Sequence, residues 1–219
     1  MVDTSRKLAQ IEEYIEEGSY FTINRARQFG KTTTMDLLFD RLSDRYLVVQ
    51  ISFEGAGEQY FRDEVTFCDR FKESIAKVLK YTPWQSERNL WISSVRTDSL
   101  DELSDSLTDF CMQIERPVLL MIDEVDKSSD NQLFLNFPGM LRNKYLERSR
   151  RGMHSTFHSV ILAGVYDVKN LKLKLRPDEE RKYNSPWNIA ADFNVDMTFH
   201  PDEIITMLNE YEADYHTGM

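Results

Sequence analysis

Short, almost wholly apolar runs alternate along this chain with longer stretches in which apolar residues recur every three or four positions. A continuous apolar run is typical of a parallel strand that is covered on both faces. The longer stretches predict amphipathic helices, each with one face to bury. Together the two patterns predict an α/β fold in which helices cover a parallel sheet. The predicted strands are residues 20–23, 46–53, 118–122 and 159–164, followed by a weaker alternating run at 193–199.

The first two predicted helices lie before and after the first strand. One covers residues 5–17, and the next runs from the loop after the first strand to about Asp44. Residues 58–115 carry two apolar stripes and are predicted to form a helical insertion after the second strand. Aromatic residues at helical spacing are more typical of core packing than of a cofactor site. The stripes are Phe67, Phe71, Ile75 and Val78, then Leu100, Leu103, Leu107 and Phe110.

Two further helices are predicted later in the chain. Residues 131–149 have a helical pattern, with Pro138-Gly139 as a candidate break. Another helix begins at His200-Pro201, because proline suits the first helical position and acidic residues suit the first turn. We interpret residues 1–199 as one core domain and residues 200–219 as the start of a lid or linker helix.

Gly30-Lys31-Thr32 follows the first predicted strand and opens the second helix. It is the second half of the phosphate-binding pattern G-x-x-x-x-G-K-[ST], in which lysine reaches the β- and γ-phosphates and the hydroxyl coordinates Mg²⁺. Arg25 stands where the pattern has its first glycine, which predicts a loop without positive φ there and a guanidinium that could contact phosphate. Because strand, loop, helix and strand form a βαβ unit, we predict a nucleotide-binding loop. Its predicted residues are Arg25, Arg27, Phe29, Gly30, Lys31, Thr32 and Thr33.

A second signature ends the strand at residues 118–122, where Asp123-Glu124 follows five apolar residues. In open α/β sheets, ligands bind at the carboxyl ends of the strands. Asp123 is therefore predicted to hold Mg²⁺ together with Thr32, and Glu124 to act as the base that orients the attacking water. Taken alone, the same pattern also fits a buried strand followed by solvated acids. Combined with the upstream loop, it favours binding of ATP and Mg²⁺.

Composition limits the partners and the compartment. A hydrophobic content of 41% is sufficient for a core, whereas a net charge of −10 disfavours a broad nucleic-acid surface but not a local basic groove. Cys68 and Cys111 lie in apolar-periodic segments and are predicted to be buried free thiols, which fits a reducing cytoplasm. No signal peptide or run of membrane-spanning length is recognisable. We therefore expect a cytoplasmic protein without a membrane partner.

Basic residues gather near the end of the helix predicted at 131–149. A solvated helix end stabilised by the helix dipole is one interpretation. The alternative is an arginine finger that reaches the nucleotide of a neighbouring subunit in a homo-oligomer. The residues are Arg142, Lys144, Arg148, Arg150 and Arg151.

The strand at 159–164 is a candidate carrier of a polar sensor for the γ-phosphate. Ser159 lies at its start, and Tyr166 and Asp167 lie just past its end. His154 and His158 are four residues apart, but no third ligand accompanies them and we expect no metal site there.

Several of these stretches resemble the AAA-ATPase-like family of bacterial and archaeal proteins, many of which carry a C-terminal nuclease-like domain of the PD-(D/E)XK class. The loop at residues 25–32 is similar to the family's Arg-Pro-Arg-Arg-Phe-Gly-Lys-Thr, with Ala26 in place of proline. The family thus shares the arginine at position 25. Similar matches occur at residues 2–4, 119–124, 162–167, 185–190 and 196–197. No nuclease-type motif is evident in these 219 residues.

The resemblance implies a P-loop NTPase of the additional-strand (ASCE) class, a three-layer αβα fold with strand order 5-1-4-3-2. It implies that Lys31, Thr32, Asp123 and Glu124 carry nucleotide binding and hydrolysis, and that a protein or nucleic-acid client could be engaged through a C-terminal domain. We expect ATP hydrolysis that drives a conformational change in a larger assembly. The alternative is an interaction module that binds ATP with little turnover. A small-molecule kinase fits less well, because Glu124 suits water activation better than acceptor binding.

Overall fold

The computed structural model describes residues 4–26, 30–82, 84–125, 132–151, 156–165, 187–198 and 201–215. At its centre is a parallel four-stranded sheet in the order β1-β4-β3-β2. The paired residues Asn24 and Gly164, and likewise Ser52 and Asp123, bring the carboxyl ends of the strands to one edge. The strands are β1 (Tyr20–Asn24), β2 (Leu47–Ser52), β3 (Val118–Asp123) and β4 (Ser159–Gly164).

The described part of residues 193–199 forms no strand, so the prediction of a strand there is wrong. The fifth strand that it would have placed beside β1 is therefore not formed by these residues. A single parallel bridge joins Phe21 to Ala191, whose amide donates to the carbonyl of Tyr20 at 2.8 Å. Beyond it, side chains hold the segment in place of a backbone ladder. Phe193 stacks on Phe21 with ring centroids 5.5 Å apart, and the carbonyl of Val195 accepts a hydrogen bond from a side chain. The order in the described sheet is therefore 1-4-3-2.

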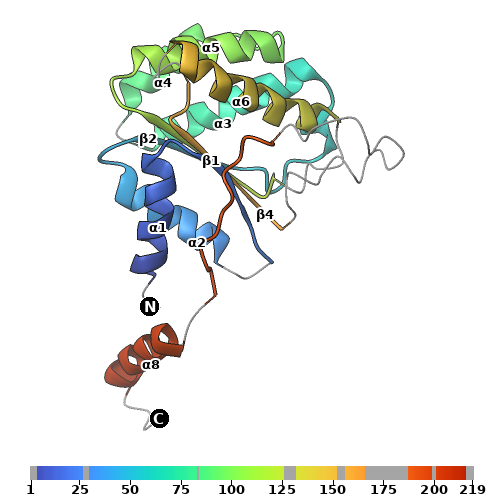
Figure 1. The fold of residues 1–219 in the computed structure, drawn as a ribbon. Helices are drawn as coiled ribbons and strands as arrows, with labels where there is room; N and C mark the ends of the chain where they lie inside the picture. The colour runs from blue at the N-terminus through green and yellow to red at the C-terminus, as the bar shows by residue number, and fades with distance from the viewer. Residues whose placement is uncertain are drawn as a thin grey trace.

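Two helices cover one face of the sheet (Figure 1). They are α1 (Ser5–Glu16) and α2 (Lys31–Leu42), as the apolar periodicity predicts. Their core-facing stripes are fully or almost fully buried, which fixes both helices against the strands. The stripes are Leu8, Ile11 and Ile15 on α1 and Met35, Leu38 and Leu42 on α2.

The opposite face is covered by helices that lie between β2 and β3, together with α6 (Figure 1). Both predicted apolar stripes lie within this layer, and α3 packs directly on β2. Asp63 and Ser99 cap α3 and α5, because each side chain accepts a hydrogen bond from a first-turn amide. The elements are η1 (Glu58–Phe61), α3 (Glu64–Lys80), α4 (Gln85–Ser94), α5 (Leu100–Gln113) and α6 (Gln132–Arg151). The result is the expected three-layer αβα arrangement.

Both cysteines are buried free thiols, as predicted. Burial raises the pKa of Cys68 and of Cys111 to about 12. Each thiol therefore stays protonated near neutral pH and acts as a small apolar side chain.

The break expected at Pro138-Gly139 is wrong, because α6 continues through Pro138. Phe134, Phe137 and Leu141 are each at most 1% exposed. Their burial supplies the packing free energy that keeps the helix formed despite the missing backbone donor. α8 (Pro201–Tyr215) lies apart from the sheet (Figure 1). None of the described helices is both long and apolar enough to span a bilayer.

Two of the basic residues of α6, Lys144 and Arg148, are buried and do not belong to a solvated face. Lys144 is 2% exposed and donates to the Thr108 hydroxyl at 2.7 Å. Arg148 is 9% exposed and donates to the carbonyls of Gly18 and His158, at 2.9 and 2.6 Å. These hydrogen bonds therefore connect α6 to α5, to the turn after α1 and to the start of β4. Arg142 bonds the Asn188 side chain at 2.8 Å, and the side chains of Arg150 and Arg151 lie outside the described residues.

Candidate functional site

The loop after β1 leads directly into α2. Its first amide, that of Arg25, donates to the carbonyl of Gly164 at 3.2 Å and extends the pairing with β4 by one residue. Arg25 has no positive φ, as predicted for a bulky residue in place of the first glycine. Gly30 caps α2 with φ +68°, a conformation that glycine adopts without strain. Arg27 and Phe29 lie outside the described residues.

Lys31 lies folded back over this loop. Its side chain is only 7% exposed, and Nζ donates to the carbonyls of Arg25 and Ala26 at 2.9 and 3.1 Å. The ammonium is thus held among the backbone groups of the loop where a phosphate is expected. Thr32 and Thr33 follow it on the exposed first turn of α2.

A short hydrogen bond joins this turn to the end of β3. The Thr32 hydroxyl donates to Asp123 Oδ2 at 2.6 Å, although the two residues are 91 positions apart in the sequence. Asp123 is 5% exposed, and its Oδ1 accepts from the Glu124 amide at 2.8 Å. A hydroxyl and a carboxylate, both hard oxygen ligands, therefore meet at the edge where α/β folds bind ligands. This donor set fits Mg²⁺, which prefers one or two protein oxygens together with water and phosphate.

Glu124 has an unusual backbone. Its φ is +56°, and no other non-glycine residue in the described part of the chain has a positive φ. Such a conformation costs about 1–3 kcal/mol and persists only where the surroundings impose it. The strained residue lies directly beside Asp123, at the position expected for a catalytic base. The sequence carries no signal for this strain.

Arg25 connects the loop to a distant segment of the chain. Its guanidinium donates to the carbonyl of Val195 at 3.0 Å and to that of Asn24 at 2.9 Å. It also lies 5.8 Å from the ring centroid of Phe193. In this structure the side chain therefore holds residues 193–195 against the edge of β1, a role that sequence reasoning missed. Contact between Arg25 and a phosphate stays a prediction.

We expect Arg25→Ala to release this segment, because the variant removes both the hydrogen bond to Val195 and the contact with Phe193. Amide hydrogen exchange at residues 191–198 should speed up, whereas exchange within β3 should not change. Arg45→Ala is a matched control, because the Arg45 side chain is 50% exposed and pairs with Glu16. Unchanged exchange combined with weaker nucleotide binding would instead indicate direct phosphate contact.

The proposed sensor is placed differently from expectation. Ser159 lies at the amino end of β4 and is completely buried, with its hydroxyl donating to the carbonyl of Ser19 at 2.6 Å. In a parallel sheet this end is opposite the edge that carries Asp123, so Ser159 cannot reach the site. Tyr166 and Asp167 lie outside the described residues.

His158, one of the two histidines noted in the sequence, lies away from the site. His158 packs on Tyr46 with ring centroids 5.4 Å apart, before β4 begins, and His154 lies outside the described residues. Within the described part of the chain, no three His, Cys, Asp or Glu side chains gather as a metal-binding group.

Three solved structures with a similar fold come from chains of which this chain covers about half or somewhat more. The Walker-type ATPase PABY2304 of Pyrococcus abyssi matches with a TM-score of 0.61 and 15% identity, over 99% of this chain and 59% of that one. The ORC1 protein of Aeropyrum pernix, solved in complex with DNA, matches with a TM-score of 0.56 and 12% identity, over 98% and 50%. Cdc6p of Pyrobaculum aerophilum matches with a TM-score of 0.53 and 14% identity, over 94% and 48%. At these identities the likeness establishes the fold alone.

The sequence itself gives the family. No curated protein sequence matches significantly. The family model for the AAA-like domain matches residues 4–218, which confirms the resemblance seen in the loop and strand motifs. This match includes the loop before α2, the acidic end of β3 and α8. The chain therefore belongs to the AAA-like domain family.

Proposed function

We propose that this domain binds ATP with Mg²⁺ at the loop between β1 and α2, and that it hydrolyses the ATP. The observation that carries the proposal is the 2.6 Å hydrogen bond between Thr32 and Asp123. It joins a residue of the predicted phosphate loop to the predicted metal ligand, although the two are 91 positions apart in the sequence. An acid that served only as the solvated end of a buried strand would face water and would not need to contact this hydroxyl.

Each residue then has a distinct task. Lys31 exchanges its bonds to the loop carbonyls for the β- and γ-phosphates, and Gly30 lets the backbone approach them. Thr32 and Asp123 would hold Mg²⁺, which would neutralise charge on the phosphates. Glu124 accepts a proton from the attacking water and orients it.

The same arrangement offers a route from the nucleotide to the rest of a larger assembly. Arg25 contributes a carbonyl to Lys31 and a guanidinium to Val195. The segment around Val195 leads on to α8, whose Ile204, Ile205 and Leu208 are 38–54% exposed. When Lys31 moves to a phosphate, the Arg25 carbonyl loses its hydrogen bond to Nζ. A resulting shift of Arg25 is passed to this segment through the hydrogen bond to Val195. We propose that hydrolysis shifts α8 and, through it, a protein or nucleic-acid client.

Release of phosphate from ATP tests the proposal. The chain should release phosphate in the presence of Mg²⁺ and stop when the metal is removed with a chelator. Asp123→Asn should need more Mg²⁺ for half-maximal rate, because a neutral amide is a weaker ligand than a carboxylate. Binding of ATP without measurable phosphate release would replace the ATPase by the nucleotide-regulated interaction module.

A further inference from the structure

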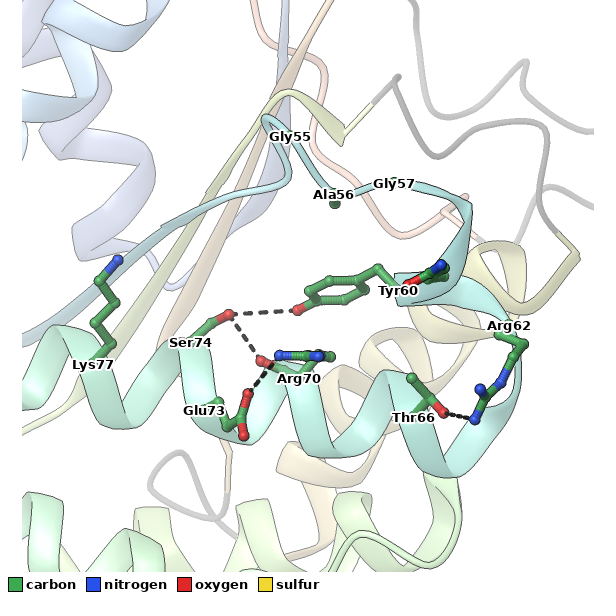
Figure 2. A pocket seen from close by; sticks show the side chains of 11 residues that line it. Gly55, Ala56, Gly57, Tyr60, Arg62, Thr66, Arg70, Glu73, Ser74 and Lys77 are labelled. Carbon is green, nitrogen blue, oxygen red and sulfur yellow. Dashed lines mark hydrogen bonds and ion pairs between the residues drawn. The ribbon is translucent and has the colours of Figure 1, made fainter.

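A groove lies outside the nucleotide loop, between residues 55–60 and one face of α3 (Figure 2). Its volume is about 570 Å³. Thr66, Arg70, Ser74 and Lys77 come from successive turns of α3, and residues three or four apart on a helix share a face. We call this cavity the α3 groove.

The groove is basic although the protein is acidic. Arg62, Arg70 and Lys77 line it against one carboxylate, that of Glu73, in a chain with a net charge of −10. Lys77 is exposed and makes no hydrogen bond or ion pair with any residue that the structure describes. A local concentration of positive charge on an acidic protein attracts anions to that place.

The two arginines are also open to an anion. Arg62 pairs with Asp63 at 2.7 Å and Arg70 with Glu73 at 3.2 Å, but the arginine side chains are 73% and 60% exposed. Exposed pairs of this kind contribute about 0–1 kcal/mol, so an incoming anion can compete with them.

The spacing of the cations distinguishes between kinds of anion. Figure 2 shows Arg62 and Lys77 toward opposite ends of the groove, with Arg70 between them. Arg70 and Lys77 are two turns apart on α3, or about 10 Å along the axis. One phosphate cannot contact all of them, whereas the successive phosphates of a nucleic-acid strand present negative charges at several points along the groove. An extended polyanion with regularly spaced charges therefore fits better than a small ligand.

The opposite wall of the groove leaves its backbone open. Among the residues that the structure describes, a Cβ atom added at Gly55 or Gly57 would meet nothing within 4 Å. The Tyr60 hydroxyl lies 3.5 Å from that of Ser74, inside the groove. Burial raises the pKa of Tyr60 to about 12, so its hydroxyl remains a hydrogen-bond donor at neutral pH. Hydroxyl donors next to cations are typical of surfaces that position a phosphate backbone.

We propose that the α3 groove binds the phosphate backbone of a nucleic-acid strand. As far as the nucleic acid is taken to be the client of the ATPase, this inference rests on the function proposed above. The groove also adjoins the site, since the amide of Phe53, just before Gly55, donates to the carbonyl of Asp123 at 3.0 Å.

Fluorescence polarisation with a labelled single-stranded oligonucleotide tests the groove without nucleotide present. Lys77→Glu should weaken binding by at least about tenfold at 50 mM salt and reduce the dependence on salt, because one contact with its released counterion is lost. Lys80→Glu is the matched control, with the same charge change on the same helix but outside the groove. Glu73→Gln should tighten binding, a gain that a folding defect cannot produce.

Equal loss in Lys77→Glu and Lys80→Glu, or no effect of Glu73→Gln, would overturn the proposal. Equally tight binding of a poly-glutamate peptide would also overturn it, in favour of an acidic protein partner. Affinity for a fluorescent ATP analogue, measured on the same variants, should not change. If the oligonucleotide binds as expected and the ATP analogue does not bind at all, the groove stands and the ATPase proposal falls.

Discussion

Glu124→Gln should slow phosphate release by roughly 10²–10⁴-fold, the usual contribution of a general base. The amide keeps the shape of the side chain but cannot take the proton of the attacking water. In the proposed mechanism Glu124 acts only in the transition state, so ATP affinity should stay the same. It could rise slightly, since a carboxylate near the γ-phosphate is repulsive. Phosphate release and calorimetric ATP binding, measured on one preparation, separate the two effects.

The backbone of Glu124 allows a second, sharper variant. Glycine adopts φ +56° without strain, so Glu124→Gly should unfold at the same or a higher denaturant concentration, with a gain of up to about 1 kcal/mol. Its phosphate release should nevertheless be as slow as that of Glu124→Gln. Glu13→Gln, at an exposed position on α1, controls for the loss of a carboxylate. Phosphate release at the parent rate in either Glu124 variant would show that Glu124 is not the base.

Lys31→Ala should weaken ATP binding as well as turnover. In the proposed site the ammonium contacts the β- and γ-phosphates already in the ground state. A hydrogen bond to a charged group contributes about 1.5–3 kcal/mol, which corresponds to a loss of about 10- to 100-fold in affinity. Calorimetry with ATP and Mg²⁺ measures it directly.

The fold of the Lys31 variant needs its own control. Lys31 is 7% exposed and bonds two loop carbonyls, so its removal could also disturb the loop. Circular dichroism and thermal unfolding should match the parent chain if the effect is confined to the site. Lys80→Ala, on an exposed helix end, should bind ATP normally. An unchanged ATP affinity in a folded Lys31→Ala variant would contradict a phosphate-binding role.

The strands and the main site could be predicted from the sequence because their signals are local. Gly30 and Lys31 come one short loop after an apolar run, and Asp123 ends another. The parallel order of the strands then brings their carboxyl ends together without further information. Local pattern was therefore sufficient to place Thr32 and Asp123 at one edge, where they meet at 2.6 Å.

The failures concern residues whose partners are distant in the sequence. Basic residues near a helix end suggest solvation, but Arg148 is buried and donates hydrogen bonds to the carbonyls of Gly18 and His158. No sequence pattern indicates that these residues are its partners. The alternating run at 193–199 resembles a strand, yet Phe193 and the Arg25 guanidinium fix its start by side-chain contacts. Nor does any sequence pattern reveal a positive φ, so the strain at Glu124 could only come from the structure.

The most direct test of the central claim is a calorimetric titration of the unmodified chain with a slowly hydrolysed ATP analogue, first with Mg²⁺ and then with a chelator. One nucleotide should bind per chain, and more tightly when Mg²⁺ is present, because Thr32 and Asp123 are expected to hold the metal against the phosphates. Absence of binding under both conditions, or an affinity that is independent of Mg²⁺, would contradict it.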